Sequence, residues 1–149
     1  MKIQYPALVS EDKDDQRFLV KFAHFDEAIT EGSSLQEALQ NAVEVLTLTL
    51  EGRMDEGLPI PLPPTSGASE AYWVAPAARV QAALLVRFHR IQPTAMLAKQ
   101  LQTSWPAAAR LEDPHHSPSL RQLERAASAM GLRLVISLEA LGGHMMSSD

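Results

Sequence analysis

The segment 94–111, TAMLAKQLQTSWPAAARL, constrains the fold more than any other part of this chain. It divides into two short helical patterns, and each begins at a residue that favours the N-cap position, Thr94 in the first and Ser104 in the second. The expected inward stripe of the two helices consists of Leu97, Ala98, Leu101, Ala108 and Leu111. The spacing therefore predicts two helices joined by a tight turn, which is a helix-turn-helix.

The second of these helices has the form of one that enters the major groove of DNA. The predicted DNA-binding residues are Thr94, Thr103, Ser104, Trp105, Ala109 and Arg110. An ordinary helical hairpin with no DNA to read has the same spacing, so spacing alone leaves both interpretations open. Trp105 is large enough to fold back into the core instead of facing DNA. The run SWPAAARLE resembles Xre/Cro-type DNA-binding domains, and Gln102 stands in the turn where that family usually has glycine. The resemblance therefore implies a left-handed backbone at a residue that disfavours it.

Length and composition suit one domain or two small ones, since 46% of the 149 residues are hydrophobic. The absence of cysteine excludes a disulfide framework and a thiolate metal site, and it fits a reducing cytoplasm. No apolar run approaches membrane-spanning length, and the N-terminus begins with one lysine and a polar strand. We therefore expect a soluble cytoplasmic protein with no membrane partner.

The net charge of −5 is unevenly distributed. Residues 1–63 carry five Lys/Arg against twelve Asp/Glu, a net charge of −7, whereas residues 64–149 carry eight against six, a net charge of +2. An acidic N-terminal part repels nucleic acid and attracts a basic protein, and a mildly basic C-terminal part suits phosphate contacts.

Alternating apolar residues predict strands over 3–9 and 18–22, joined by a polar turn as an antiparallel hairpin. A capping box of Ser34 and Glu37 predicts a helix that ends before Gly52 and covers one face of a small sheet. The segment before this helix is expected to be a loop or short strand that tucks Phe25 and Ile29 under it. A proline-rich extended crossing then leads to a strand over 71–74 that closes the sheet.

The C-terminal part begins with a predicted helix over 76–91, with Val80, Leu84, Phe88 and Ile91 toward the core. Arg79, Arg87 and Arg90 are expected on its surface, where they touch phosphates or are only solvated. The last helix is predicted to start at Ser117–Pro118 and to stop at Gly131. Its expected inward residues are Leu120, Leu123, Ala127 and Met130.

The run LRLVISL after this helix alternates as a strand that has no partner within a helical domain. An unpaired apolar edge invites pairing with a second chain, so we predict a dimer seam there. Its residues are Leu132, Arg133, Leu134, Val135, Ile136, Ser137 and Leu138. The tail, residues 140–149, has no pattern and is predicted to be mobile.

Three groups of polar residues resemble metal or acid/base sites without the required spacing. The aspartates at 12, 14 and 15 lack the glycine and distal glutamate of a calcium loop, so a solvated turn is expected. His24, Asp26 and Glu27 have no matching nucleophile elsewhere. The adjacent His115 and His116 point apart and make a poor chelate. We therefore predict no metal, no cofactor and no enzymatic activity.

The run SWPAAARLE resembles the S-x-P-x-x-x-R-L-E pattern of Xre/Cro-type DNA-binding domains. The order of Tyr5-Pro6-Ala7, FLVKF, a Phe/Asp loop, GSSLQEALQNAVEVLTLTLE and GLPIPLPP resembles the HicB antitoxin family, in its form with an Xre-like C-terminus. This resemblance implies an α+β chain with a partial ribonuclease-H-like N-terminal domain and a helical DNA-binding domain. It also implies a partner, a small basic RNA-cleaving HicA toxin.

We therefore expect a toxin-binding domain at 1–75, a DNA-binding and dimerisation domain at 76–139, and a tail. The predicted function is a non-enzymatic antitoxin that occludes a HicA-like toxin and represses its own operon as a homodimer or larger homo-oligomer on operator DNA. One alternative is a stand-alone helix-turn-helix regulator whose N-terminal domain senses a small molecule. Another is a metal-dependent nuclease, although no acidic residues spaced to hold two metals are visible.

Overall fold

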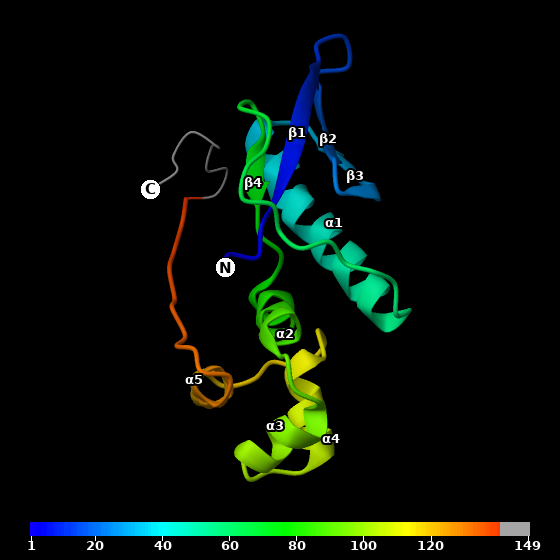
Figure 1. Cartoon of the computed structure of the whole chain (residues 1–149). Coiled ribbons are helices and arrows are strands. Elements are labelled where there is room, and N and C mark those ends of the chain that lie inside the picture. The colour runs from blue at the N-terminus through cyan, green and yellow to red at the C-terminus, as the bar shows by residue number, and fades with distance from the viewer. Residues whose placement is uncertain (141–149) are drawn as a thin grey trace. The chain divides into compact units, whose positions relative to one another are not determined.

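The computed structural model describes residues 1–140, which divide into two compact units (Figure 1). Unit 1 comprises residues 1–77 together with 138–140, and unit 2 comprises residues 78–137. The predicted tail lies outside the described residues, apart from Ala140.

Unit 1 is a four-stranded antiparallel sheet with one long helix on one face (Figure 1). Its elements are β1 (Tyr5–Asp12), β2 (Arg17–Phe22), β3 (Phe25–Gly32), α1 (Leu35–Asp55) and β4 (Tyr72–Val74). The spatial order is β3-β2-β1-β4, so the predicted hairpin of the first two strands forms the centre of the sheet. The predicted strand near residue 72 pairs with β1 and closes that edge, as expected.

The eight-residue strand β3 stands where the sequence predicted a loop or short strand. Phe25 is buried as predicted, but the prediction for Ile29 was wrong, because its side chain is 51% exposed. The reason is an irregular register: Phe22 pairs with Phe25, yet the neighbouring Lys21 pairs with Ile29. This step inverts the alternation of side chains, so Phe25 and Ile29 lie on opposite faces of the sheet.

Helix α1 begins where the capping pattern predicts, with the Ser34 hydroxyl accepting from the Glu37 N–H at 3.1 Å. The return half of the box differs, because the Glu37 carboxylate accepts from the backbone and side chain of Ser33. The helix runs through Gly52 and stops one turn later, so the predicted end was wrong. Gly57 follows with φ of +69°. The N–H groups of Gly57 and Leu58 donate to carbonyls of the last turn, a Schellman motif.

The buried stripe of α1 consists of Ala38, Leu39, Ala42, Leu46, Thr47, Leu50 and Glu51, whereas Leu35 is exposed and Val43 is half-buried. The core of unit 1 lies between this stripe and the sheet. Its largest fully buried side chains are Tyr5, Val20, Phe25, Leu46 and Leu50. The rings of Tyr5 and Phe25 meet edge to face, with centroids 4.8 Å apart.

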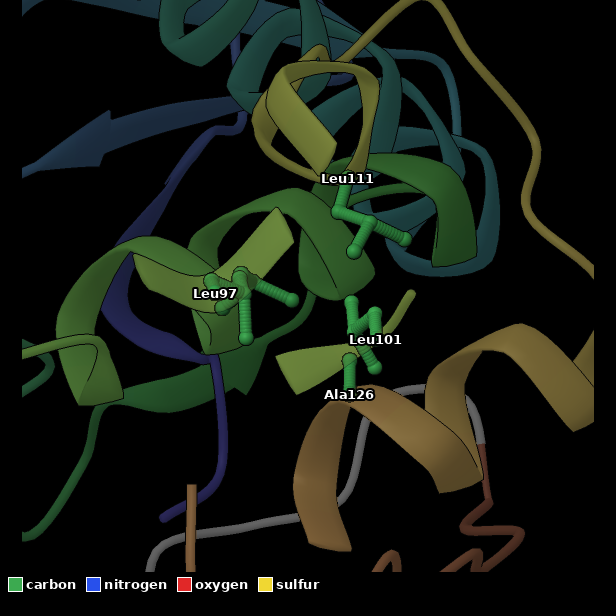
Figure 2. Packing of buried hydrophobic residues seen from close by; sticks show 5 residues of the cluster. Leu97, Leu101, Leu111 and Ala126 are labelled. Carbon is green, nitrogen blue, oxygen red and sulfur yellow. The ribbon is translucent and has the colours of Figure 1, made fainter. Parts of the chain in front are cut away.

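Unit 2 consists of short helices around a small core. Its elements are α2 (Ala78–His89), α3 (Thr94–Gln100), α4 (Trp105–Ala109), the 3₁₀ turn η1 (Arg110–Glu112) and α5 (Leu120–Ala129). Figure 2 shows the core side chains gathered between these helices and labels Leu97, Leu101, Leu111 and Ala126. The core cluster comprises Val86, Leu97, Leu101, Leu111 and Ala126.

All five residues of the predicted inward stripe of α3 and α4 are buried. Predictions at the helix ends of unit 2 were wrong for both α2 and α5. Helix α2 spans 78–89 and not 76–91, and α5 follows the N-cap Ser119 and not Ser117–Pro118. Ile91 is 95% exposed, because α2 ends at His89 and leaves it in the connection before Pro93. Leu120 is 61% exposed, because it is the first residue of α5 and only later turns of this helix pack against the cluster.

Candidate functional sites

The connection between α3 and α4 is a compact turn fixed by backbone hydrogen bonds. The N–H of Thr103 donates to Ala98 at 3.0 Å and the N–H of Gln102 donates to Lys99 at 3.1 Å, a second Schellman motif. Gln102 has φ of +54°, so it adopts the left-handed backbone that the sequence requires there. The Arg125 guanidinium donates to the Leu101 carbonyl at 2.9 Å and holds the turn from α5.

The predicted DNA-binding residues occupy two places. Thr103, Ser104, Trp105, Ala109 and Arg110 lie together in the turn and along α4, whereas Thr94 starts α3. Ser104 is the N-cap of α4 and accepts from the Ala107 N–H at 3.2 Å. The N-cap prediction for Thr94 was wrong, because Pro93 takes that position without a side-chain bond and Thr94 is the first helical residue.

Trp105 and Arg110 are the large exposed side chains at the two ends of α4: Trp105 is its first residue, and Arg110 follows it as the first residue of η1. Trp105 is 57% exposed, so it faces outward from the unit 2 core. The Arg110 side chain is exposed, and its guanidinium makes no hydrogen bond or ion pair within residues 1–140. An exposed indole at the start of α4 and an unpaired guanidinium directly after it can contact a base, a sugar or a phosphate.

Arg90, in contrast, is already engaged within unit 2. Its guanidinium binds both carboxylate oxygens of Glu112, at 2.5 and 3.3 Å, and donates to the Gln92 carbonyl at 2.6 Å. This pair ties the end of α2 to η1, directly after α4. Arg90 therefore holds η1 in position relative to α2. Because its guanidinium is already bound, Arg90 is not available to contact phosphate.

The charges separate more sharply by structural unit than by sequence halves. Residues 1–77 carry five Lys/Arg against thirteen Asp/Glu, a net charge of −8. Residues 78–137 carry eight against three, a net charge of +5. A basic helical unit attracts polyanions, and an acidic unit attracts basic proteins.

The segment 132–138, predicted as a dimer seam, is extended and forms no β-ladder with any described residue. Val135, Ile136 and Leu138 are 75%, 65% and 98% exposed, respectively. Leu134 is the half-buried exception. This segment therefore presents apolar side chains to solvent. The predicted strand is not formed within residues 1–140, and the pairing with a second chain stays a prediction.

Glu27, considered above with His24 and Asp26, is bound by Arg53 from α1. The guanidinium donates to both carboxylate oxygens at 2.8 Å, and this hydrogen bonding lowers the pKa of Glu27 from 4.5 to about 2. Arg53 also donates to the Pro59 carbonyl at 3.1 Å and lies over the Phe25 ring. Tyr5 donates to the Pro61 carbonyl at 2.7 Å.

These contacts bind the proline-rich crossing to the sheet and helix. No motif in the sequence marks Arg53, although a basic residue in the last turn of a helix is a recognisable signal. The aspartate turn is organised by its own backbone, since Asp12 accepts from the N–H groups of Asp14 and Asp15. Across residues 1–140, no three His, Cys, Asp or Glu side chains group as metal ligands.

The helices within residues 1–140 are all too short or too polar to cross a membrane. An acidic sheet-and-helix unit joined to a basic unit of short helices defines a two-part binding protein. Residues 4–81 match the family model described as HicB_like antitoxin of bacterial toxin-antitoxin system. This chain therefore belongs to the HicB-like antitoxin family, and its role is that of the antitoxin toward a toxin partner.

A curated relative extends the similarity beyond unit 1. Antitoxin HicB 1 of Photorhabdus laumondii subsp. laumondii is 27% identical over 139 residues. That alignment covers 92% of this chain and 88% of the relative, so it includes most of unit 2 as well.

Proposed function

We propose that this antitoxin binds and occludes a HicA-like, mRNA-cleaving toxin through unit 1 and represses its own operon by binding operator DNA through unit 2. It acts in the cytoplasm and without enzymatic activity of its own. The observation that carries the proposal is the separation of charge between residues 1–77 and residues 78–137, −8 against +5, in a chain of an antitoxin family. The basic unit also holds the two-helix pair with Trp105 and Arg110 exposed.

In the DNA complex, α3 and α4 form an Xre-like helix-turn-helix, with α4 in the major groove. Trp105 has one N–H donor and a broad apolar face, so it presses against thymine methyl groups or sugar. Arg110 contacts guanine if it reaches the bases and phosphate if it does not. Thr103 and Ser104 lie at the start of the same helix and are in position to meet the DNA backbone.

The test of DNA binding compares Arg110→Ala and Trp105→Ala with Arg121→Ala, which removes an exposed arginine from α5. If Arg110 reads guanine, its loss costs about 1–3 kcal/mol and relaxes preference at one base pair. If it holds phosphate, binding weakens on all sequences alike and the salt dependence becomes shallower. Equal affinity, base preference and salt slope in the parent and both α4 variants would remove α4 from the interface.

The proposed assembly is a homodimer in which segments 132–138 pair across a two-fold axis and place two DNA-binding helices about one helical turn apart. Val135→Pro removes a ladder donor and inserts a ring into this seam. Val135→Thr keeps the N–H and is the matched control. Sedimentation should show a monomer for the proline variant only; a proline variant that stays dimeric with its fold intact contradicts the seam.

The test of the partner uses the full chain co-expressed with the small basic protein encoded beside it. We expect the two proteins to co-purify and the antitoxin to restore growth. A chain that neither binds nor silences that protein, but changes operator affinity when a small molecule is added, would instead support the stand-alone regulator.

A further inference from the structure

One face of the unit 1 sheet is covered by α1, and the opposite face is not. α1 packs against the face that carries Ala7, Val20 and Phe22, all of which are buried. On the opposite face, the strand register places Leu8, Lys21 and Ile29 side by side in one row, and Ser10, Leu19 and Glu31 in the next. We call these two rows the open face.

The open face keeps apolar surface in contact with solvent. Leu8 is 44% exposed and Ile29 is 51% exposed, and Leu19 in the adjacent row is half-buried. Leu19 is the diagonal neighbour of both Leu8 and Ile29, within reach of long side chains on a sheet, and Lys21 lies between Leu8 and Ile29 in the same row. An apolar patch bordered by charged residues is typical of a surface that binds another protein.

A hollow of about 590 Å³ continues the open face toward the β1–β2 turn. It is lined by Ser10, Glu11, Asp12, Lys13, Asp14, Asp15, Arg17, Leu19 and Glu31. Five of these residues are acidic and two are basic, and Arg17 is already paired with Glu31 at 3.1 Å. The hollow is therefore acidic and open to a lysine or arginine side chain from a partner.

We infer that the open face is the surface on which the toxin docks, with apolar side chains of the toxin on Leu8, Leu19 and Ile29 and its basic side chains in the acidic hollow. This inference rests on the proposed function, since it takes the partner to be a basic protein. Charge complementarity selects that occupant: a basic toxin is attracted to the hollow, whereas nucleic acid and acidic peptides are repelled. The helix face of the sheet is filled by α1 and offers no such surface.

The experiment uses the full chain and the basic toxin encoded beside it, with binding measured by calorimetry. The test variant is Leu8→Lys/Ile29→Lys, which removes apolar contact and adds two positive charges to the open face. The matched control is Leu48→Lys/Leu62→Lys, which adds the same charge at two leucines that are each 61% exposed on α1 and on the proline-rich crossing. We expect the test variant to weaken binding by about 100-fold and the control by less than about threefold.

The acidic hollow has its own pair of variants. Asp14→Asn/Asp15→Asn should weaken binding by about tenfold and make it less sensitive to salt, whereas Glu44→Gln/Glu56→Gln on and after α1 should not. Carbodiimide labelling of the unaltered complex needs no substitution. The carboxylates of Asp14, Asp15 and Glu31 should lose reactivity when the toxin binds.

The outcomes separate this inference from the proposed function. If the unaltered chain binds the toxin, but the control pair weakens binding and the open-face pair does not, the toxin docks elsewhere and the inference is wrong. If the unaltered chain binds no basic toxin at all, the partner assignment fails and the inference fails with it. Circular dichroism melting of each variant excludes loss of fold as the cause of weaker binding.

Discussion

The two units of this chain are held together in different ways. Unit 1 has a 21-residue helix laid on a sheet, with Tyr5, Phe25 and Leu46 fully buried between them. Unit 2 has helices of 5 to 12 residues around a cluster that includes Leu97 and Ala126. Isolated helices that short are unstable in water, so the shape of unit 2 depends on a few core side chains and on the bonds at its turns. The proposed DNA-binding surface therefore lies on the unit whose helices are shorter and depend more on tertiary packing.

The same contrast is visible where the helices stop. α1 and α3 both end in Schellman motifs, but the left-handed residue is Gly57 in one and Gln102 in the other. Gly57 adopts this backbone without strain, and a Cβ at that position meets nothing within 4 Å. Gln102 adopts it against its own preference, in a turn that Arg125 holds from α5.

The largest expected effect is Leu97→Ala, which removes a fully buried side chain from the unit 2 core. We expect the free energy of unfolding of unit 2 to fall by about 2–5 kcal/mol. Each unit contains one tryptophan, so Trp73→Phe and Trp105→Phe backgrounds report the units separately during urea unfolding. Met96→Ala, at an exposed position of the same helix, is the control. A parallel loss in both units would mean that they unfold as one.

A smaller loss is expected at Thr47, a buried residue of α1. Its hydroxyl donates to the Val43 carbonyl at 2.7 Å and accepts from the Ala77 N–H at 2.9 Å, where unit 1 ends. Thr47→Val leaves that N–H without its partner and should cost unit 1 about 1–3 kcal/mol. Thr47→Ser keeps the hydroxyl and should recover most of the loss. Equal urea midpoints for the valine variant and the parent would contradict this role.

The left-handed residues that follow α1 and α3, Gly57 and Gln102, can be tested by exchanging glycine and glutamine at the two positions. Gly57→Gln should destabilise unit 1 by about 1 kcal/mol, and Gln102→Gly should stabilise unit 2 by about the same amount, since each changes the strain of one left-handed residue. Gly52→Gln is the control, because Gly52 lies within α1 and a Cβ there also has free space. Thermal unfolding measures all three. Two shifts of the same sign would show that side-chain contacts, not backbone strain, distinguish the two ends.

The smallest effect concerns the ion pair of Glu27 and Arg53, since the Glu27 side chain is 49% exposed. The folded-state pKa of Glu27 is lowered from 4.5 to about 2, so its contribution is fully present above pH 4.5 and is lost as the pH falls toward 2. At pH 7, Glu27→Gln should cost unit 1 at most about 1 kcal/mol. The difference in unfolding free energy between parent and variant should shrink between pH 4.5 and 2. A difference that grows in this range would contradict a lowered pKa of Glu27 in the folded state.

Short-range chemistry was sufficient to predict much of both units from the sequence. The Ser34 and Ser104 caps, the first two strands, the buried stripe of α3 and α4, and the left-handed Gln102 all depend on residues within a few positions of one another. Periodicity and capping act over one or two turns, so they are visible in a single sequence.

The tertiary structure decided the features that depend on distant neighbours. The register step between β2 and β3 turned Ile29 away from α1 and created the open face, and no local pattern marks it. The pairing of Arg53 with Glu27 joins positions 26 residues apart. Trp105 faces outward because other side chains fill the unit 2 core. Capping and periodicity act within one helix or hairpin and could be read locally, whereas the register of β3 and the partner of Arg53 depend on packing between elements that are distant in the sequence.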